Sequence, residues 1–187
     1  MKNKYLLPIL FFSIILLIGC RKEPKAPIPE QELITTLKLT LTDTFTHISH
    51  TYTFKDLDGD GGEPATIDTI KLAANKVYTA SLLLLDERNF PPDTTTNEIK
   101  TLSTEHQFFY QAVPENQLIN FTYLDFDTNG KPLGNLFSFK TNNPSQGILR
   151  IILRHQPNKS GINVDKNDIT HAGGETDIEV DFPLIIY

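Results

Sequence analysis

The sequence predicts an all-β fold, an immunoglobulin-like sandwich of about nine short strands with one short helix. Among its 187 residues are 21 Thr but only 7 Ala, and β-branched side chains favour strands over helices. From Ile34 onward, apolar and polar residues alternate with a period of two, as they do in half-buried strands. Clusters of Gly, Pro, Asn and Asp interrupt this alternation at the short intervals typical of sandwiches.

Residues 1–19 are predicted to be a lipoprotein signal peptide. Two lysines precede an apolar run over residues 5–18, which is shorter than the roughly 20 residues of a membrane-spanning helix. Residues 17–20, Leu-Ile-Gly-Cys, match a bacterial lipobox, in which a small residue precedes the Cys that accepts the lipid. Cys20 is the only Cys of the chain, so we expect lipidation there. The alternative is an ordinary signal peptide with an incidental Cys.

Residues 20–32 are then the lipidated Cys and a tether, and residues 33–187 are the β-domain. Three prolines and alternating charges favour a semi-extended spacer between lipid and domain. Several acyl chains on one Cys give a stable membrane anchor. Arg21, rather than Asp, follows the Cys, and by analogy with enteric bacteria this indicates the outer membrane. The sequence leaves open whether the protein faces the periplasm or the cell surface.

Nine segments fit the strand pattern. The helix candidate begins at Thr95, has Glu98 at the spacing of a capping box, and extends to about Thr104. Segment 77–86 is the most apolar, so we expect it at the centre of a sheet and buried on both faces. The predicted strands cover residues 37–42, 48–55, 67–72, 77–86, 106–112, 118–126, 136–141, 148–155 and 178–186.

One acidic loop is a candidate calcium site. Asp56, Asp58 and Asp60 alternate on a Gly-containing loop, as in the first half of an EF-hand. The twelfth position is Ile67 rather than Glu, so the loop is not an EF-hand. Residues 125–130 repeat the spacing more weakly. The alternative is turn chemistry, because Asp, Asn and Gly favour hairpin turns.

A second candidate site uses nitrogen and oxygen ligands. His106, His155 and His171, together with Glu175 or Asp177, are the residue types that bind zinc or a similar ion. His155 shares strand parity with the apolar residues of segment 148–155, so a hydrogen-bonded core or rim histidine is the alternative. The sequence does not show whether these side chains meet.

Other function classes have little support. The net charge of -6 and pI of about 5.3 argue against a nucleic-acid binder, which needs a basic face. The chain has none of the short motifs typical of serine hydrolases, phosphate-binding loops or zinc proteases, so we expect no enzyme. Arg154 and Lys159 form a basic cluster at a strand end that would bind an anion or a partner's carboxylate. A solvated loop is the alternative there.

Several motifs, in order along the chain, resemble a family of short Bacteroidetes outer-membrane lipoproteins. That family often carries the label "type 1 periplasmic binding fold superfamily protein", and it has no established chemistry. The label conflicts with the sequence, because a periplasmic binding fold needs two lobes of alternating strands and helices. The resemblance implies a companion of TonB-dependent outer-membrane receptors. It rests on the lipobox and on residues 31–36, 56–61, 105–110, 154–159 and 173–180.

Together these observations predict a lipid-anchored, non-enzymatic cell-envelope binding protein. Its role would be accessory to a TonB-dependent receptor in the uptake of a nutrient or metal ion. Calcium would be the ion at the acidic loop, and zinc the ion at the histidines. The alternative is a structural or adhesive envelope domain without a small ligand. Convergence of the polar side chains in the fold would favour the first hypothesis, and scatter would favour the second.

Overall fold

The computed structural model describes residues 32–59 and 61–187, which contain ten strands, one α-helix and three 3₁₀ turns. The helix is α1 (Thr95–Thr101), and the turns are η1 (Ser103–Glu105), η2 (Val164–Lys166) and η3 (Ile169–His171). The strands are β1 (Thr36–Asp43), β2 (Ser49–Lys55), β3 (Thr66–Ile67), β4 (Ile70–Leu72), β5 (Val77–Leu85), β6 (His106–Val113), β7 (Leu118–Tyr123), β8 (Leu136–Thr141), β9 (Ser145–His155) and β10 (Glu175–Ile186).

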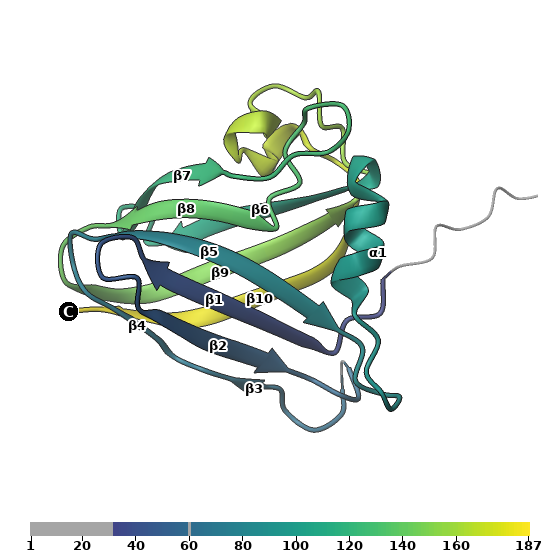
Figure 1. Ribbon diagram of the computed structural model, residues 1–187, viewed down its shortest axis with the longest axis horizontal. Coiled ribbons are helices and arrows are strands. Elements are labelled where there is room, and N and C mark those ends of the chain that lie inside the picture. Colours follow the sequence, from purple (N-terminus) through teal and green to yellow (C-terminus); the bar gives the residue numbers. More distant parts are fainter. Residues whose placement is uncertain (1–31, 60) are drawn as a thin grey trace, which may run out of the picture. The chain divides into compact units, whose positions relative to one another are not determined.

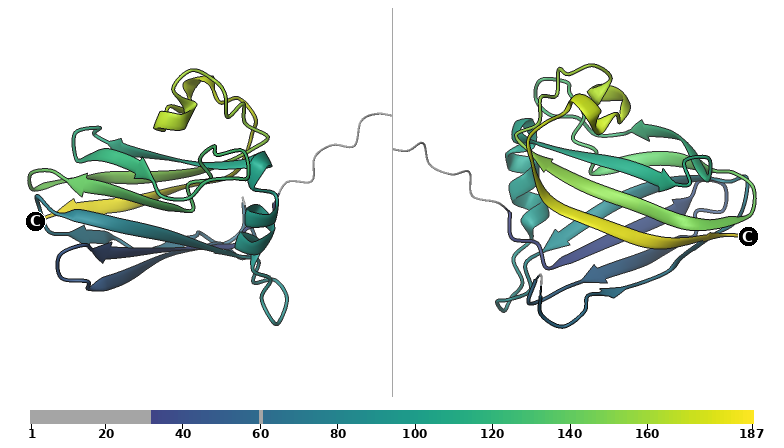
Figure 2. Two further views of the ribbon diagram at one scale, coloured as in Figure 1. Left: turned by 45° about the horizontal axis from the view of Figure 1, so that its top comes forward. Right: turned by 180° about the vertical axis from the view of Figure 1, so that it is seen from behind.

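These strands form two sheets that pack face to face, which confirms the predicted all-β sandwich with a short helix (Figure 1). The six-stranded sheet has the order β3-β2-β1-β5-β8-β7, and the four-stranded sheet has the order β4-β10-β9-β6. All neighbours are antiparallel except β4 and β10, which pair in parallel. Figure 2 shows the two layers from the side.

Most predicted strands are confirmed within a few residues, but two expectations were wrong in detail. The predicted strand 67–72 is two strands, because the chain crosses between the sheets at Asp68 and Thr69: β3 pairs with β2, and β4 pairs with β10. Strand β5 does lie inside the six-stranded sheet, yet only one of its faces is fully buried. Its outer face carries Thr79, Ser81 and Leu83, and the Leu83 side chain remains 39% exposed.

The core lies between the sheets and consists of the alternate residues of each strand. In the six-stranded sheet it includes Leu37, Leu39 and Leu41 of β1 and the aromatic rings of β8. The four-stranded sheet contributes inward residues of β6, β9 and β10, including Phe108, Tyr110, Ala112, Leu149, Ile151, Leu153, Ile178, Val180, Phe182, Leu184 and Ile186. The period-two pattern of the sequence thus becomes one continuous apolar layer.

Helix α1 lies across one end of the sandwich, between the end of β5 and the start of β6 (Figures 1 and 2). It begins where the sequence predicts, but the expected capping box does not form. The Thr95 hydroxyl donates instead to the carbonyl of Leu33 at 3.3 Å, and the backbone N–H of Leu84 donates to the Thr96 hydroxyl at 2.7 Å. Both hydroxyls are therefore engaged in these contacts and do not cap the N-terminus of the helix.

The loop between β9 and β10 covers part of the outer face of the four-stranded sheet. Phe109 and Ile152 point outward from this sheet and pack against Val164 and Ala172 of the loop, which forms a second small core. The segment with η2 and η3 lies over β6 in Figure 1. This cover explains why β6, although an edge strand, has buried residues on both faces.

The predictions for Cys20 and for residues 1–31 lie outside the described residues, and so does Asp60. In the part of the chain that the structure describes, no helix is long and apolar enough to cross a membrane.

Candidate metal centre

Three potential metal ligands meet at the α1 end of the four-stranded sheet. They are His106, the first residue of β6, His155, the last residue of β9, and Asp177 near the start of β10. One ligand atom from each lies within 4.8 Å of the other two. The three strands are neighbours in the sheet, so the backbone fixes the three side chains relative to one another.

Strand periodicity directs both histidines into the interior. His106 has the parity of Phe108, and His155 has the parity of Leu153, so both rings share the core face of the sheet. The two residues are also direct partners across the β6–β9 ladder. Their ring centroids lie 4.7 Å apart in an edge-to-face arrangement, as expected for a cross-strand pair.

A β-bulge brings Asp177 to the same place. Thr176 pairs with Arg154 and Ile178 pairs with Leu153, so Asp177 is an extra residue without a partner in the ladder. The extra residue lets the side chains of Asp177 and Ile178 both face inward, and the Asp177 side chain is fully buried. Bulges re-aim side chains in this way and are frequent beside functional sites.

No hydrogen bond of ordinary geometry from another described residue reaches the atoms that face one another, although the Asp177 carboxylate interacts with the backbone N–H of Glu32 and with the side chain of His155. These atoms are Nε2 of His106, Nδ1 of His155 and both carboxylate oxygens of Asp177, and all are buried. His106 Nε2 lies 3.5 Å from Asp177 Oδ2, and His155 Nδ1 lies 3.6 Å from Asp177 Oδ1. Ligand atoms around a tetrahedral ion with bonds of about 2.0–2.1 Å are about 3.3 Å apart. The two His–Asp separations are thus within a few tenths of an ångström of this value, and all three ligand atoms lie within 4.8 Å of one another.

The backbone holds His106 in the tautomer that a metal needs. Nδ1 of His106 lies 3.1 Å from the carbonyl oxygen of Leu102, which can only accept, so Nδ1 carries the proton. In the neutral ring this leaves the lone pair on Nε2 free to bind an ion. Burial, and to a smaller extent the neighbouring His155, lower the pKa of His106 despite the Leu102 hydrogen bond, which favours the neutral ring.

Two further carboxylates lie close to the two histidines. Glu32 Oε1 lies 3.8 Å from His106 Nε2, and Glu105 Oε2 lies 4.0 Å from His155 Nε2. Burial raises the pKa of Asp177, and burial together with the nearby Glu98 carboxylate raises the pKa of Glu32 to about 7. Burial is the largest cause of both shifts; the Glu98 and Asp177 carboxylates add to the shift of Glu32, whereas His155 and the Glu32 backbone oppose that of Asp177. Sequence reasoning missed Glu32, because its charged and Pro-rich surroundings indicate only a tether.

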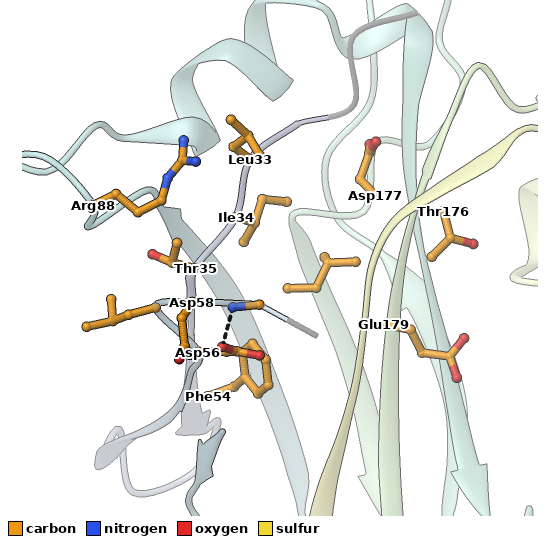
Figure 3. A pocket seen from close by; sticks show the side chains of 13 residues that line it. Leu33, Ile34, Thr35, Phe54, Asp56, Asp58, Arg88, Thr176, Asp177 and Glu179 are labelled. Carbon is orange, nitrogen blue, oxygen red and sulfur yellow. Dashed lines mark hydrogen bonds between the residues drawn. The ribbon is translucent and has the colours of Figure 1, made fainter. Parts of the chain in front are cut away.

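A cleft of about 530 Å³ reaches Asp177 from the edge of the sandwich (Figure 3). One wall is the segment Leu33 to Thr35, and another is the start of β10. In Figure 3 the Asp177 side chain points toward the Leu33 segment, whereas Thr176 and Glu179 point to the other side of the strand. Asp56 and Asp58 also line the cleft, so it is largely acidic, and the guanidinium of Arg88 is already paired with Asp86.

The other two residues of the predicted zinc set do not belong to this cluster. His171 is exposed on η3. Glu175, the first residue of β10, pairs with His155 along the backbone but is exposed and is not one of the residues whose ligand atoms come together. The structure therefore brings together three of the five predicted ligands.

At the predicted calcium loop, the two described carboxylates act as turn acceptors. The backbone N–H of Gly59 donates to Asp56 at 2.8 Å, and that of Glu63 donates to Asp58 at 2.9 Å. In the weaker second loop, Asp127 accepts hydrogen bonds from the backbone N–H groups of Asn129 and Lys131. These bonds fit the turn alternative, while calcium binding stays a prediction.

The predicted anion site has one residue that is already paired. Lys159 is buried, and its ammonium group donates to Asp127 at 2.9 Å and to the carbonyl of Ser103 at 2.6 Å. Arg154 is half-buried and contacts the carbonyl of Gly174 at 3.4 Å. Anion binding at Arg154 and Lys159 stays a prediction, and the Lys159 contacts favour a structural role.

Comparison of the chain with protein-family models, with curated proteins and with solved structures finds no match.

Proposed function

We propose that this chain is a lipid-anchored cell-envelope protein whose sandwich binds one divalent transition-metal ion through His106, His155 and Asp177. The lipobox at Cys20 supports the lipid anchor, and Arg21 after it supports a position at the outer membrane. The role is binding rather than catalysis, in metal-ion uptake beside a TonB-dependent receptor. That partner comes from the family resemblance.

The observation that carries the proposal is the convergence of buried ligand atoms that no hydrogen bond of ordinary geometry from another described residue reaches. An unsatisfied buried polar atom costs about 1–3 kcal/mol, and more if it is charged. A cation at the centre of the cluster satisfies Nε2 of His106, Nδ1 of His155 and the Asp177 oxygens at once. Without a cation, the protein would bear this free-energy cost in the folded state.

The ligand atoms indicate the class of ion. Two imidazole nitrogens and a carboxylate suit zinc and similar first-row ions, whereas calcium and magnesium prefer oxygen alone. The site contains no thiolate, which argues against copper(I). The carboxylates that line the cleft beside Asp177 support the proposal further, because negative charge raises the local concentration of cations.

The same convergence argues against a purely structural or adhesive domain. In such a domain, polar residues of these types would be scattered over turns and rims, as His47, His50 and His171 are. His106 is instead fully buried, and its neighbour His155 is 7% exposed. Burying two histidines and a carboxylate together, with no Lys or Arg side chain forming an ion pair with that carboxylate among the described residues, favours an ion-binding role.

The experiment is a titration of the metal-free full-length protein, in detergent, with Zn²⁺ and separately with Co²⁺. We expect one equivalent of Zn²⁺ to bind, and Co²⁺ to give the visible absorption of a site with nitrogen and oxygen ligands. Each of His106→Ala, His155→Ala and Asp177→Asn should abolish the response, because each removes one ligand. His171→Ala, which replaces an exposed histidine outside the cluster, is the matched control and should bind as the wild type does.

The same samples give a second readout by thermal unfolding. An ion that binds only the folded state at a hundredfold excess over its Kd stabilises that state by about 2.7 kcal/mol. Wild-type protein that binds neither ion would contradict the proposal. So would Zn²⁺ binding that survives all three substitutions, because the ion would then bind elsewhere. Catalytic turnover that depends on the ion would refute the non-enzymatic part.

A further inference from the structure

The segment that joins the tether to the sandwich runs past the metal centre. It begins in the described part of the chain at Glu32 and enters β1 at Thr36. Its later residues are well held, since the backbone N–H of Thr35 donates to the Leu85 carbonyl at 2.9 Å, and the Leu33 carbonyl accepts from Thr95. Glu32, which precedes these residues in the chain, lies next to His106 of the cluster.

Glu32 approaches the cluster at His106, although it is not one of the three residues whose ligand atoms all lie within 4.8 Å of one another. Its side chain is 12% exposed, and its Oε1 atom lies 3.8 Å from Nε2 of His106, similar to the 3.5 Å that separates Nε2 from Asp177. His106 Nε2 thus has one carboxylate from the junction and one from β10 within reach. Structural zinc sites have four protein ligands, and His106, His155 and Asp177 provide three.

Charge also favours this assignment. Three carboxylates, those of Glu32, Glu98 and Asp177, influence one another at this end of the sandwich. A divalent cation between Glu32 and Asp177 would compensate both charges, and Glu32 would then exchange its hydrogen bond with the Glu98 side chain for a bond to the ion. Glu98 on α1 would then lie outside the coordination sphere, beside Glu32.

We propose that Glu32 is the fourth ligand of the ion, so that metal binding clamps the junction between tether and sandwich onto strands β6, β9 and β10. This inference rests on the proposed metal site. The ion would connect the start of the domain directly to three strands that lie far from it in sequence. The point where the tether joins the domain, at Glu32, would consequently be fixed when the ion is bound and more mobile when it is not.

The first test compares Zn²⁺ affinity in the full-length protein and its variants by chelator competition. Glu32→Gln should weaken Zn²⁺ binding at least about tenfold, since loss of even an outer-sphere partner costs 10- to 100-fold. The Co²⁺ spectrum of this variant should also change, because water replaces a carboxylate. Glu115→Gln, at an exposed position between β6 and β7, is the control and should leave both readouts unchanged.

The second test is hydrogen exchange. Hydrogen exchange of the wild-type protein is compared with and without Zn²⁺, and we expect slower exchange both in the ligand strands and in the junction, residues 32–35. In Glu32→Gln, Zn²⁺ should still protect the ligand strands but no longer the junction.

The outcomes separate the two proposals. If Zn²⁺ protects no segment of the wild type, the metal site itself is wrong. If it protects the β6, β9 and β10 residues but not the junction, or if Glu32→Gln binds as tightly as the wild type, Glu32 is not a ligand and only this inference fails. A loss of affinity in a further variant, Glu175→Gln, but not in Glu32→Gln would assign the fourth position to Glu175.

Discussion

The ammonium group of Lys159 is buried in the domain, which is unusual for a lysine in a small protein. Its ammonium group binds the Asp127 carboxylate and the carbonyl of Ser103. The pair therefore connects three loops: the one after β9, the one between β7 and β8, and η1 next to the metal centre. A buried pair of this kind is costly to break from one side only, because the remaining charge stays in the interior.

Lys159→Met should destabilise the protein by about 3 kcal/mol, since it leaves the buried Asp127 without its cation. The measurement is the free energy of unfolding in urea at neutral pH. Lys166→Met, at an exposed lysine of the same loop, should change it by less than about 0.5 kcal/mol. Adding Asp127→Asn to Lys159→Met should recover part of the loss, and equal effects of the two single lysine substitutions would refute the buried-pair interpretation.

The same pair predicts a pH dependence. Burial raises the pKa of Asp127, but the hydrogen bonds from Lys159 and from the backbone of Lys131 and Asn129 outweigh it, so its pKa is lowered. A lowered folded-state pKa contributes stability that is present above the unfolded value of about 3.9 and is lost as pH falls through the folded value. The difference in unfolding free energy between wild type and Asp127→Asn should therefore be constant above about pH 5 and shrink below about pH 4. A difference that stays constant into acid would contradict this.

At the scale of elements, Asn167 is the link that fastens the β9–β10 loop to edge strand β6. Its side chain accepts from the backbone N–H of Tyr110 at 2.8 Å and donates to the Tyr110 carbonyl at 2.6 Å. It also lies 3.1 Å from the Tyr123 hydroxyl. The amide group thus replaces the strand partner that an edge position lacks, and the loop covers the edge.

Asn167→Ala should cost about 3 kcal/mol of stability, because it leaves the backbone N–H and carbonyl of Tyr110 without partners in a largely buried place. Part of any such effect comes from the backbone, since Asn167 has a φ of 70°. Asn163→Ala is the matched control: Asn163 has a φ of 59° but is exposed, so its replacement should cost only about 1 kcal/mol. Equal losses in urea unfolding would show that the side-chain bonds contribute nothing.

The strands themselves were largely predictable, and their exceptions have physical reasons. Segment 136–141 matches β8 residue for residue, because a period of two defines both the strand and its faces. The division of 67–72 into β3 and β4 was not predictable, since local alternation carries no information about which sheet a strand joins. The bulge at Asp177 was equally invisible, because it exists only relative to the partner strand β9.

At the scale of the whole molecule, the lipid anchor is the prediction with the clearest test. Cys20→Ala should abolish incorporation of labelled fatty acid, because it removes the only thiol of the chain, and the protein should no longer be anchored to membranes by lipid. Labelling in cells followed by membrane fractionation measures both effects. Ser13→Ala, a change inside the apolar run that keeps the lipobox, should be labelled like the wild type, and persistent labelling of Cys20→Ala would end the lipoprotein interpretation.

The class of fold, the positions of most strands and the residue types of a candidate ion site could be inferred from the sequence alone, because these depend on local periodicity and chemistry. His106 and His155 could be named as ligands, and the parity of His155 already placed it on the inner face. Only the tertiary structure decided that these two pair across β6 and β9, that Asp177 rather than Glu175 faces them, and that Glu32 joins them from the junction. Strand register, a bulge and the path of the chain over the end of the sandwich set these distances, and all three arise from contacts between segments far apart in sequence.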